Sequence, residues 1–457
     1  MTPTRRTALA ALAAAPFATA RPPEPDPLTL ATFTAEVTIP IGHPCMGGGI
    51  APAKEVLDPL EARGFVLRGA GRPVVFLAVD WCEIRNAAYD RFRAKVAAAV
   101  GTDPVRVLLC ALHQHDAPVV DLEAQELLDK HRAGTAVCDP AFFEKATTAV
   151  ADAAAASLKT PRRITHLGTG RARVEQVASN RRYVDEAGAV RYNRMSATRD
   201  AKIRAAGEGT IDPELKTLSF WDGDTPLAGL SAYACHPMSY YGRGGVTADF
   251  VGLARRRRQA DTPMALQLYA SGCSGNVTAG KFNDGDTANR PVLADRIYRA
   301  MAAAWRDTAR VPVTTPAFRS VPLTLEARGG EGFTDRELMT RLTTDPRPFN
   351  RCLAALGLSW ANRVRAGKPV DVPVLDFGGA VLTVLPAESY VEFQLLAQQA
   401  RPNDFVVVAG YGECGPGYIP VERAWAENDG NLTDWCWVER GSERRMSEAI
   451  RRALARG

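Results

Sequence analysis

The chain of 457 residues is 46% hydrophobic and 23% charged, a composition that supports one large globular core and excludes disordered and collagen-like proteins. Its formal net charge of +5 is too small to indicate nucleic-acid binding, so we expect no nucleic-acid partner. Beyond residue 20, no apolar run reaches membrane-spanning length without charges, and we expect no transmembrane span.

The N-terminal segment has the features of an export signal. Residues 1–20 carry Arg5 and Arg6, continue in an Ala/Leu stretch without acidic residues, and end on the small-residue triplet ATA. Paired arginines favour the twin-arginine route, with cleavage near Ala20 and a periplasmic or secreted product. The alternative is an N-terminal helix that remains part of the protein.

The pattern after the signal predicts an α/β fold. Residues 21–27, RPPEPDP, form a proline-rich spacer that cannot be a helix or an interior strand. Residues 72–84 and 104–113 are continuous aliphatic runs separated by the helix-compatible stretch 85–100, and such runs are typical of strands buried on both faces. Further strands are expected at 162–174, 215–222, 226–236, 264–271, 372–386 and 403–411, and helices at 140–158, 287–309, 335–367, 388–400 and 442–457. We therefore expect one large catalytic domain over 28–457, in which mixed β-sheets are layered with flanking helices and a helical insertion occupies 330–368.

Two features that can signal binding are assigned to structure instead. The nine cysteines contain no C-x-x-C pair and are too sparse for a disulfide scaffold, and Cys110, Cys235 and Cys273 are expected as small core residues. The basic run ARRRRQAD at 254–261 predicts a helix end that faces solvent, in preference to a phosphate-binding patch.

Polar side chains follow several predicted strands, at the point where each strand ends. They are His113, His115 and Asp116; His236; Ser274, Asn276 and Thr278; Glu388; and Tyr411, Glu413 and Tyr418. Strand ends commonly build the sites of α/β proteins, and histidines with a carboxylate suit Zn²⁺. On an extended H-x-H segment both rings point to one face, so that one can bind the metal while the other supports it or transfers a proton. The alternative is that each histidine is an ordinary core or loop residue.

Two glycine-rich motifs near these residues fail in detail. GNVTAGKF at 275–282 follows a strand as a phosphate loop does, but Phe282 replaces the hydroxyl that would bind magnesium. GCSGN at 272–276 nearly matches the nucleophile elbow, yet Asn276 stands at the closing glycine position. Nucleotide binding is therefore not expected, and the glycines are explained by a tight strand-to-helix turn.

In order and spacing these stretches resemble the catalytic domain of the neutral/alkaline (non-lysosomal) ceramidase family, over nearly the whole chain after the signal. The matching segments are VTIPIGHPCMGGGI, LHQHDAP, ASNRRY, YACHPMSYYGRGGVTADFVGLA, CSGNVTAG, LPAESY and GYIPVERAW. They correspond in turn to the family's D-I-T-P-P-I-G, S-H-T-H-S-G-P, N-R-S, H-P-T-S with S-x-D-x-x-G-x-A, A-G-[DN]-x-S-P-N, P-G-E-x-T and Y-V-T-T segments.

The resemblance implies a role for each matched residue. It makes His113, His236, Glu388 and Tyr418 the ligands of Zn²⁺, and His115 a supporting or proton-transfer group. Arg181 would face the substrate, with the adjacent Arg182 as the alternative. Thr278 stands where the family has its active-site serine, and Ser274 is the alternative hydroxyl. Asp116 and Asp249 are further candidates, as carboxylates that orient the ligating imidazoles.

The implied function is a zinc-dependent amidohydrolase that cleaves an N-acyl sphingosine (ceramide)-like lipid with metal-activated water. Its substrate would be an N-acyl amide or lipid, reached through transient contact with a membrane surface. Family members commonly carry an immunoglobulin-like C-terminal domain, and none is expected after Tyr418, only 39 residues before the end of the 457-residue chain. Two alternatives stay open: an exported amidohydrolase for peptide or cell-wall amides, and a non-catalytic exported binding protein of the same fold.

Overall fold

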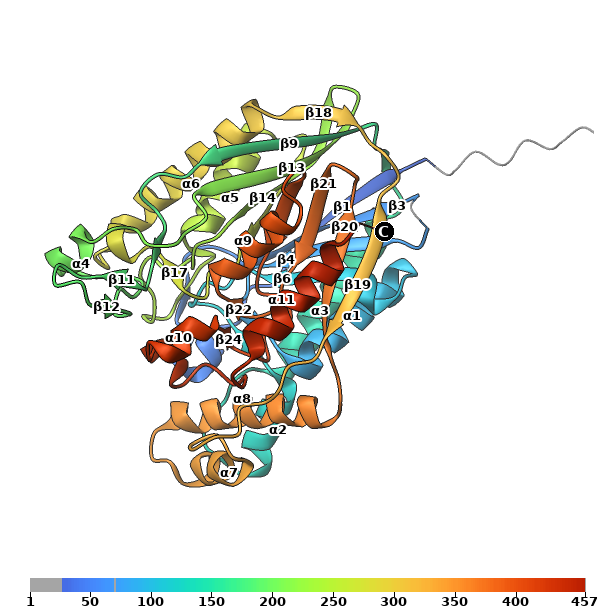
Figure 1. Ribbon diagram of the computed structural model, residues 1–457. Helices are drawn as coiled ribbons and strands as arrows, with labels where there is room; N and C mark the ends of the chain where they lie inside the picture. Colours follow the sequence, from blue (N-terminus) through green and yellow to red (C-terminus); the bar gives the residue numbers. More distant parts are fainter. Residues whose placement is uncertain (1–26, 70, 457) are drawn as a thin grey trace, which may run out of the picture.

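Three sheets of four or five strands form the centre of the computed structural model, which describes residues 27–69 and 71–456 (Figure 1). The first has the order β6-β4-β3-β1-β8, with β1 at Thr29–Glu36, β3 at Glu61–Arg68, β4 at Val74–Val79, β6 at Val107–Ala111 and β8 at Arg162–Arg163. The second has the order β16-β14-β13-β9-β18, with β9 at His166–Arg173, β13 at Glu214–Asp222, β14 at Thr225–Tyr233, β16 at Leu266–Ser271 and β18 at Ala309–Pro312. The third has the order β19-β20-β21-β23, with β19 at Ala317–Leu323, β20 at Val370–Asp376, β21 at Ala380–Val384 and β23 at Phe405–Ala409.

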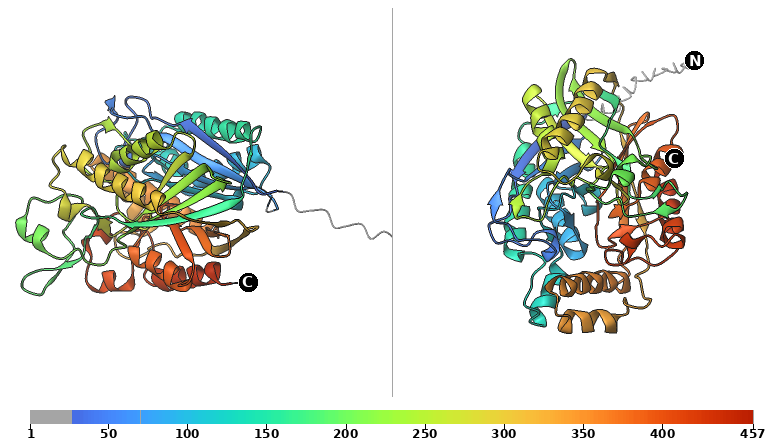
Figure 2. Two further views of the ribbon diagram at one scale, coloured as in Figure 1. Left: turned by 90° about the horizontal axis from the view of Figure 1, so that it is seen from above. Right: turned by 90° about the vertical axis from the view of Figure 1, so that its left-hand side faces the viewer.

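Helices cover the outer faces of these sheets, and the views in Figures 1 and 2 show them around the central strands. Helices α1 (Asn86–Val100) and α3 (Pro140–Ser157) lie against the first sheet, α5 (Asp249–Asp261) and α6 (Asn289–Arg306) against the second, and α9 (Val391–Ala400) and α11 (Ser442–Leu454) against the third. The remaining helices are α2 (Leu122–Lys130), α4 (Ala201–Ala205), α7 (Asp335–Thr344), α8 (Pro348–Arg365) and α10 (Glu422–Ala426). Among the described residues, no helix is both long and apolar enough to span a bilayer.

The three sheets share one apolar core between them. Phe65 of the first sheet contacts Phe220 of the second edge-on, with ring centroids 5.0 Å apart, and Phe220 contacts Phe377, which follows β20, at 5.9 Å. Leu108 and Leu382 belong to the same cluster of buried side chains. Because the apolar strands are buried on both faces, this core fixes the position of every strand end that leaves it.

Each sheet contains one parallel pair, and the carboxyl ends of these pairs meet. The pairs are β4 with β6, β14 with β16, and β21 with β23. The backbone N–H of Ala111 donates to the carbonyl of Tyr411, joining the first and third sheets at 2.9 Å. The N–H of Gly410 donates to the carbonyl of Ser271 at 2.7 Å, joining the third sheet to the second. The sheets are therefore tied together at one point, where the polar strand ends emerge.

The described residues also form short two-stranded ladders. They are β22 (Glu388–Ser389) with β24 (Tyr418–Ile419), β10 (Ser179–Asn180) with β17 (Val277–Thr278), β5 (Glu83–Ile84) with β7 (Val119–Val120), β2 (Glu55–Val56) with β15 (Gly245–Val246), and β11 (Tyr183–Val184) with β12 (Val190–Arg191). The ladder of β11 with β12 lies at the edge of the molecule beside α4 (Figure 1). Gly275 lies in the loop before β17, where an added Cβ would stand 2.1 Å from the carbonyl oxygen of Glu388. The glycine in the CSGN turn is thus required by close backbone approach.

The predicted mixed α/β fold is confirmed, including the strand, helix and strand of β4, α1 and β6. The helix expected over 335–367 is instead two helices, α7 and α8, because the prolines at 346 and 348 interrupt it. All nine cysteines are buried free thiols, in agreement with the absence of a disulfide scaffold. The predicted export signal at 1–20 lies outside the described residues.

The sequence predicted that the basic run at 254–261 is a solvent-facing helix end. The run does form the end of α5, but only part of it faces solvent. Arg255 is completely buried, and its two terminal nitrogens each donate to one carboxylate oxygen of Asp80 at 2.6 Å. Arg257 does face solvent, where it pairs with Asp295 at 2.8 Å. The prediction was wrong for Arg255 because its partner lies 175 residues away, beyond the reach of any local pattern.

Candidate metal centre

His113, His236 and Glu388 converge where the three sheets are tied together. His113 follows β6, His236 follows β14, and Glu388 begins β22 shortly after β21. His113 adopts a left-handed backbone with φ of 71°, and Ala387, just before Glu388, has φ of 56°. Such conformations are costly for residues other than glycine and cluster at functional sites. The sequence predicted an extended H-x-H segment. The chain instead turns sharply at the first histidine, His113.

The three side chains direct one atom each into a common space. Nε2 of His113 lies 3.2 Å from Nε2 of His236 and 3.2 Å from Oε2 of Glu388, and Nε2 of His236 lies 3.0 Å from the same oxygen. Two ligand atoms on a tetrahedral zinc ion lie about 3.3 Å apart, given bond lengths of about 2.0–2.1 Å. The triangle of donor atoms thus has the dimensions of one face of a tetrahedral zinc site.

Backbone carbonyls fix the orientation of both imidazoles. Nδ1 of His113 lies 3.0 Å from the carbonyl oxygen of Cys82, and Nδ1 of His236 lies 2.5 Å from that of Ser274. A carbonyl can only accept, so Nδ1 is assigned the proton in each ring and Nε2 is left with a lone pair. Two lone pairs and a carboxylate oxygen then face one another, and a metal ion, or in its absence a proton on His113, relieves their repulsion.

The electrostatics of the cluster agree with cation binding. Burial lowers the pKa of His113, but the carboxylate of Glu388 outweighs burial and holds that pKa above its usual value. Burial and the charge of Arg181 lower the pKa of His236 to about 4. Burial raises the pKa of Glu388, but the two histidines outweigh it and keep that carboxyl ionised, with a pKa well below its usual value. The anionic oxygen and the two nitrogen lone pairs match the donor types that zinc prefers.

Tyr418 and Arg181 complete the wall beside Glu388. Parallel pairing of β22 with β24 places Tyr418 directly opposite Glu388. The buried Arg181 donates from Nη1 to the hydroxyl of Tyr418 at 2.7 Å and to the carbonyl of Gly275 at 3.0 Å. Burial raises the pKa of Tyr418, and Arg181 partly opposes that effect. Tyr418 is thus neighbour to one triangle ligand, and its own role as a ligand stays a prediction.

Two solved structures match this arrangement of elements over most of its length. A ceramidase complexed with C2 superposes with a TM-score of 0.66 at 17% sequence identity, covering 94% of this chain and 75% of the ceramidase chain. The neutral ceramidase from Pseudomonas aeruginosa superposes with a TM-score of 0.65 at 17% identity, covering 94% and 74%.

The chain has the neutral-ceramidase fold.

The likeness bears on architecture, because an identity of 17% does not carry activity from one protein to another. No family model matches the sequence, and no curated protein matches it. The resemblance drawn from the motifs is confirmed at the level of the fold, and the chemistry of this neutral-ceramidase fold has to be argued from its own side chains.

His115 stands beside the triangle without joining its hydrogen bonds. Its ring lies edge-on to those of His113 and His236, with centroids 5.2 and 6.2 Å away, and its nitrogens fall within 4.8 Å of theirs. Both ring nitrogens are buried and have no hydrogen-bond partner among the described residues. Burial and the neighbouring histidines hold the pKa of His115 well below its usual value. The ring is therefore a neutral base next to the proposed metal position.

The two alternative hydroxyl groups have different surroundings. Ser274 is buried, and its Oγ lies 2.7 Å from the hydroxyl of Tyr411, whose ring stacks on His113 at a centroid distance of 4.2 Å. The hydroxyl of Thr278 instead donates to the carbonyl of Met195 at 2.9 Å. Ser274 therefore contacts Tyr411 and His236. Thr278 is hydrogen-bonded to Met195, which is not one of the triangle residues. The catalytic role of either hydroxyl stays a prediction.

The structure distinguishes the two arginines that are candidates for facing the substrate. Arg181 reaches Tyr418, as described, whereas Arg182 forms a two-point ion pair with Glu427 at 2.6 and 2.7 Å. Of the two, only Arg181 contacts a residue of the predicted site, and its contact with the substrate stays a prediction.

Asp116 and Asp249 do not orient the imidazoles. An oxygen of Asp116 accepts from the backbone N–H of Gly242 at 2.9 Å, and those of Asp249 accept from Ser239 at 2.6 and 3.1 Å. The positions expected for these carboxylates are filled by the carbonyls of Cys82 and Ser274. The sequence prediction for the two aspartates is therefore corrected, because backbone groups that any residue carries do the orienting.

Sequence reasoning missed Glu83 and named Tyr411 only as a polar residue at a strand end. Glu83 lies in the run 72–84, which reads as one strand, and its Oε1 stands 4.0 Å from Nδ1 of His113 while Oε2 accepts from Arg85 at 2.8 Å. Tyr411 ends a predicted strand but received no role, and it contacts both His113 and Ser274. Its place at a strand end did mark Tyr411 as a candidate, whereas nothing local distinguishes Glu83.

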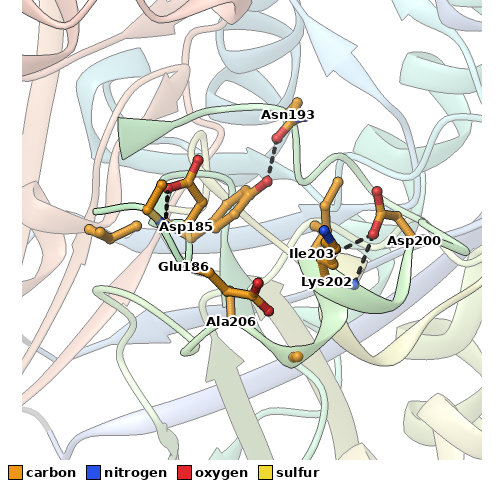
Figure 3. Close-up of a pocket in the computed structure, with 11 residues that line it drawn as sticks. Asp185, Glu186, Asn193, Asp200, Lys202, Ile203 and Ala206 are labelled. Carbon is orange, nitrogen blue, oxygen red and sulfur yellow. Dashed lines mark hydrogen bonds between the residues drawn. The ribbon is translucent and has the colours of Figure 1, made fainter. Parts of the chain in front are cut away.

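A cavity of about 500 Å³ lies away from the metal ligands, in the segment that follows Arg181. Figure 3 shows its walls, which include Asp185, Glu186, Asn193, Asp200 and Lys202. Its lining contains both signs of charge and none of the residues of the triangle. We therefore propose no reaction or ligand for this cavity.

Proposed function

We propose that the protein is a zinc-dependent hydrolase that cleaves an amide bond, with an N-acyl sphingosine (ceramide)-like lipid as its substrate. The observation that carries the proposal is the triangle of His113 Nε2, His236 Nε2 and Glu388 Oε2, whose sides are 3.0 to 3.2 Å. Tyr418 is proposed as the fourth ligand, since it pairs with Glu388 in β22 and β24.

Zinc held by these residues would act as a Lewis acid, activating water near neutral pH and polarising the amide carbonyl. The ring nitrogens of His115 have no hydrogen-bond partner among residues 27–69 and 71–456, and this histidine takes the proton from the attacking water and passes it to the departing amine. Water adds to the carbonyl carbon, the C–N bond breaks, and a fatty acid and an amine result. The buried Nε of Arg181 has no hydrogen-bond partner in the described part of the chain, and we assign it as a donor to a polar oxygen of the substrate.

The lipid substrate is supported by the neutral-ceramidase fold, and the amide chemistry by the site. The test is hydrolysis by the purified protein of a short-chain N-acyl sphingosine, beside an N-acyl amino acid and a peptidoglycan fragment. Release of sphingosine, absent in His113→Ala, supports the proposal. Cleavage of one of the other amides alone would replace the lipid substrate, and zinc binding without any hydrolysis would favour the non-catalytic binding protein.

We also propose that the protein acts outside the cytoplasm, on the basis of the signal at residues 1–20. Cell fractionation of the wild type and of a variant with both Arg5→Lys and Arg6→Lys tests this. Retention of the double variant in the cytoplasm supports twin-arginine export, while equal export of both forms would contradict that route.

A further inference from the structure

The loop Ser239–Gly245 carries two tyrosines and contacts His115. The ring of Tyr241 stands edge-on to that of His115, with centroids 4.9 Å apart and planes inclined by 70°. Tyr241 is half-buried, and Tyr240 points elsewhere, under the guanidinium of Arg290 at 3.8 Å from its ring centroid. The loop therefore presents one of its two tyrosines to His115.

Two carboxylates hold this loop in place. Asp116 accepts from the N–H of Gly242, immediately after Tyr241, and Asp249 accepts from both the N–H and the hydroxyl of Ser239. Asp116 directly follows His115 in the chain, so the same short segment carries the histidine and anchors the loop that covers it. Gly242 and Gly244 have φ of 87° and 91°, which allows the sharp turn that returns the chain toward β15.

These contacts are the ones that fix the ring of His115. Its nitrogens make no hydrogen bond to any described residue, in contrast to those of His113 and His236, which carbonyls hold. Three aromatic rings contact it in T-shaped geometry instead, those of His113, His236 and Tyr241. Edge-to-face contact restrains a ring without occupying its nitrogens, which a group that both accepts and donates a proton requires.

We propose that Tyr241, anchored through Gly242 by Asp116, is the positioning residue for His115. It holds the imidazole beside the metal ligands with both nitrogens available. This inference rests on the proposed function for its effect on turnover, but its effect on the packing of His115 does not depend on that function. The ring edge of Tyr241 matters here, and its hydroxyl does not.

The first measurement is steady-state kinetics on the N-acyl amide that the wild type cleaves, with zinc content determined for every variant. Tyr241→Ala should lower kcat by roughly tenfold to a hundredfold, with KM and zinc content little changed, because the loss falls on proton transfer. Tyr241→Phe should retain wild-type kcat. Tyr240→Ala is the matched control in the same loop and should change kcat far less than Tyr241→Ala.

The second measurement needs no substrate. Carbethoxylation by diethyl pyrocarbonate is followed at His115 by peptide mass spectrometry, with the exposed His131 as the internal reference. Tyr241→Ala and Asp116→Ala should speed modification of His115 relative to His131. Asp116→Asn should not, because the asparagine oxygen still accepts from Gly242.

Several results would overturn the inference. They are unchanged His115 reactivity in Tyr241→Ala, an equal effect of Tyr240→Ala, loss of zinc in Tyr241→Ala, or loss of activity in Tyr241→Phe. If the wild type cleaves no amide, the proposed function fails, and the carbethoxylation rates alone still decide whether Tyr241 positions His115.

Discussion

Nε2 of His113 and Nε2 of His236 lie 3.2 Å apart, although 123 residues separate them in the chain. Each ring is turned toward the other because its Nδ1 is held by a carbonyl oxygen, of Cys82 and Ser274 respectively. Two imidazole nitrogens at this separation, beside the Glu388 carboxylate, favour a positive charge among them, either a proton on His113 or a metal ion. The predictions below follow from this centre and from the buried polar contacts that support it.

Replacing His236 with alanine removes one corner of the triangle, so we expect the variant to lose bound zinc and all hydrolase activity. Elemental analysis of the purified protein gives the zinc content per chain. His131→Ala, which changes an exposed histidine, serves as the control and should keep the metal. Full zinc occupancy in His236→Ala would remove this residue from the ligand set.

Removing the metal should destabilise the fold, because a ligand that binds only the folded chain adds to the free energy of unfolding. A zinc concentration a thousand times its dissociation constant contributes about 4 kcal/mol. Thermal unfolding of the protein before and after chelator treatment measures the shift, and added zinc should reverse it. An unchanged Tm, with complete metal loss shown by elemental analysis, would contradict a site formed by the folded chain.

Arg255→Ala should lower the free energy of unfolding by about 3–5 kcal/mol, because it leaves the buried carboxylate of Asp80 without its two-point partner. Urea denaturation of the purified variant measures the loss. Arg257→Ala in the same helix is the matched control, and we expect little change there because that side chain is exposed and pairs at the surface. Similar losses in both variants would show that burial does not distinguish them.

Asp116 should make stability depend on pH. Burial raises its pKa from 3.8 to about 6, so its protonation favours the folded state. That contribution is complete below pH 3.8 and is lost as the pH rises through about 6. The side chain introduced by Asp116→Asn does not titrate. The free energy of unfolding of the variant should therefore rise relative to that of the wild type by roughly 2–3 kcal/mol between pH 4 and pH 7. Denaturant titrations of both proteins at each pH give the difference in their free energies of unfolding, from which the contributions of the other titratable groups cancel. A difference that does not change with pH would refute the raised pKa of Asp116.

Tyr411→Phe should lower the free energy of unfolding by about 1 kcal/mol, because Ser274 loses a hydrogen-bond partner while the ring still stacks on His113. Tyr411→Ala should cost about 3–5 kcal/mol, since it also removes the buried ring. Urea denaturation separates the two effects. Tyr298→Phe, at an exposed hydroxyl bonded to Asp261, is expected to change little. Equal losses for the two Tyr411 variants would mean that stacking contributes nothing.

The sequence determined the elements from which the centre is built. Apolar runs of strand length end at residues 113 and 236, and a third run ends shortly before 388, so the positions of the three triangle residues at strand ends could be predicted. This worked because burial on both faces of a strand leaves a continuous aliphatic signature, and because a polar residue that interrupts it stands out locally. The mixed α/β class followed from the same local patterns.

Tertiary structure alone decided which partners those residues have. Arg255 reads as part of a solvated helix end, yet it is buried on Asp80; Asp116 reads as a partner of imidazole, yet it holds the Tyr241 loop. Glu83 carries no local signal at all. Each of these outcomes depends on groups far apart in the chain or on backbone carbonyls, which every residue possesses. Hydrophobic periodicity is a property of neighbouring residues, whereas pairing of buried polar groups is settled only when the three sheets pack.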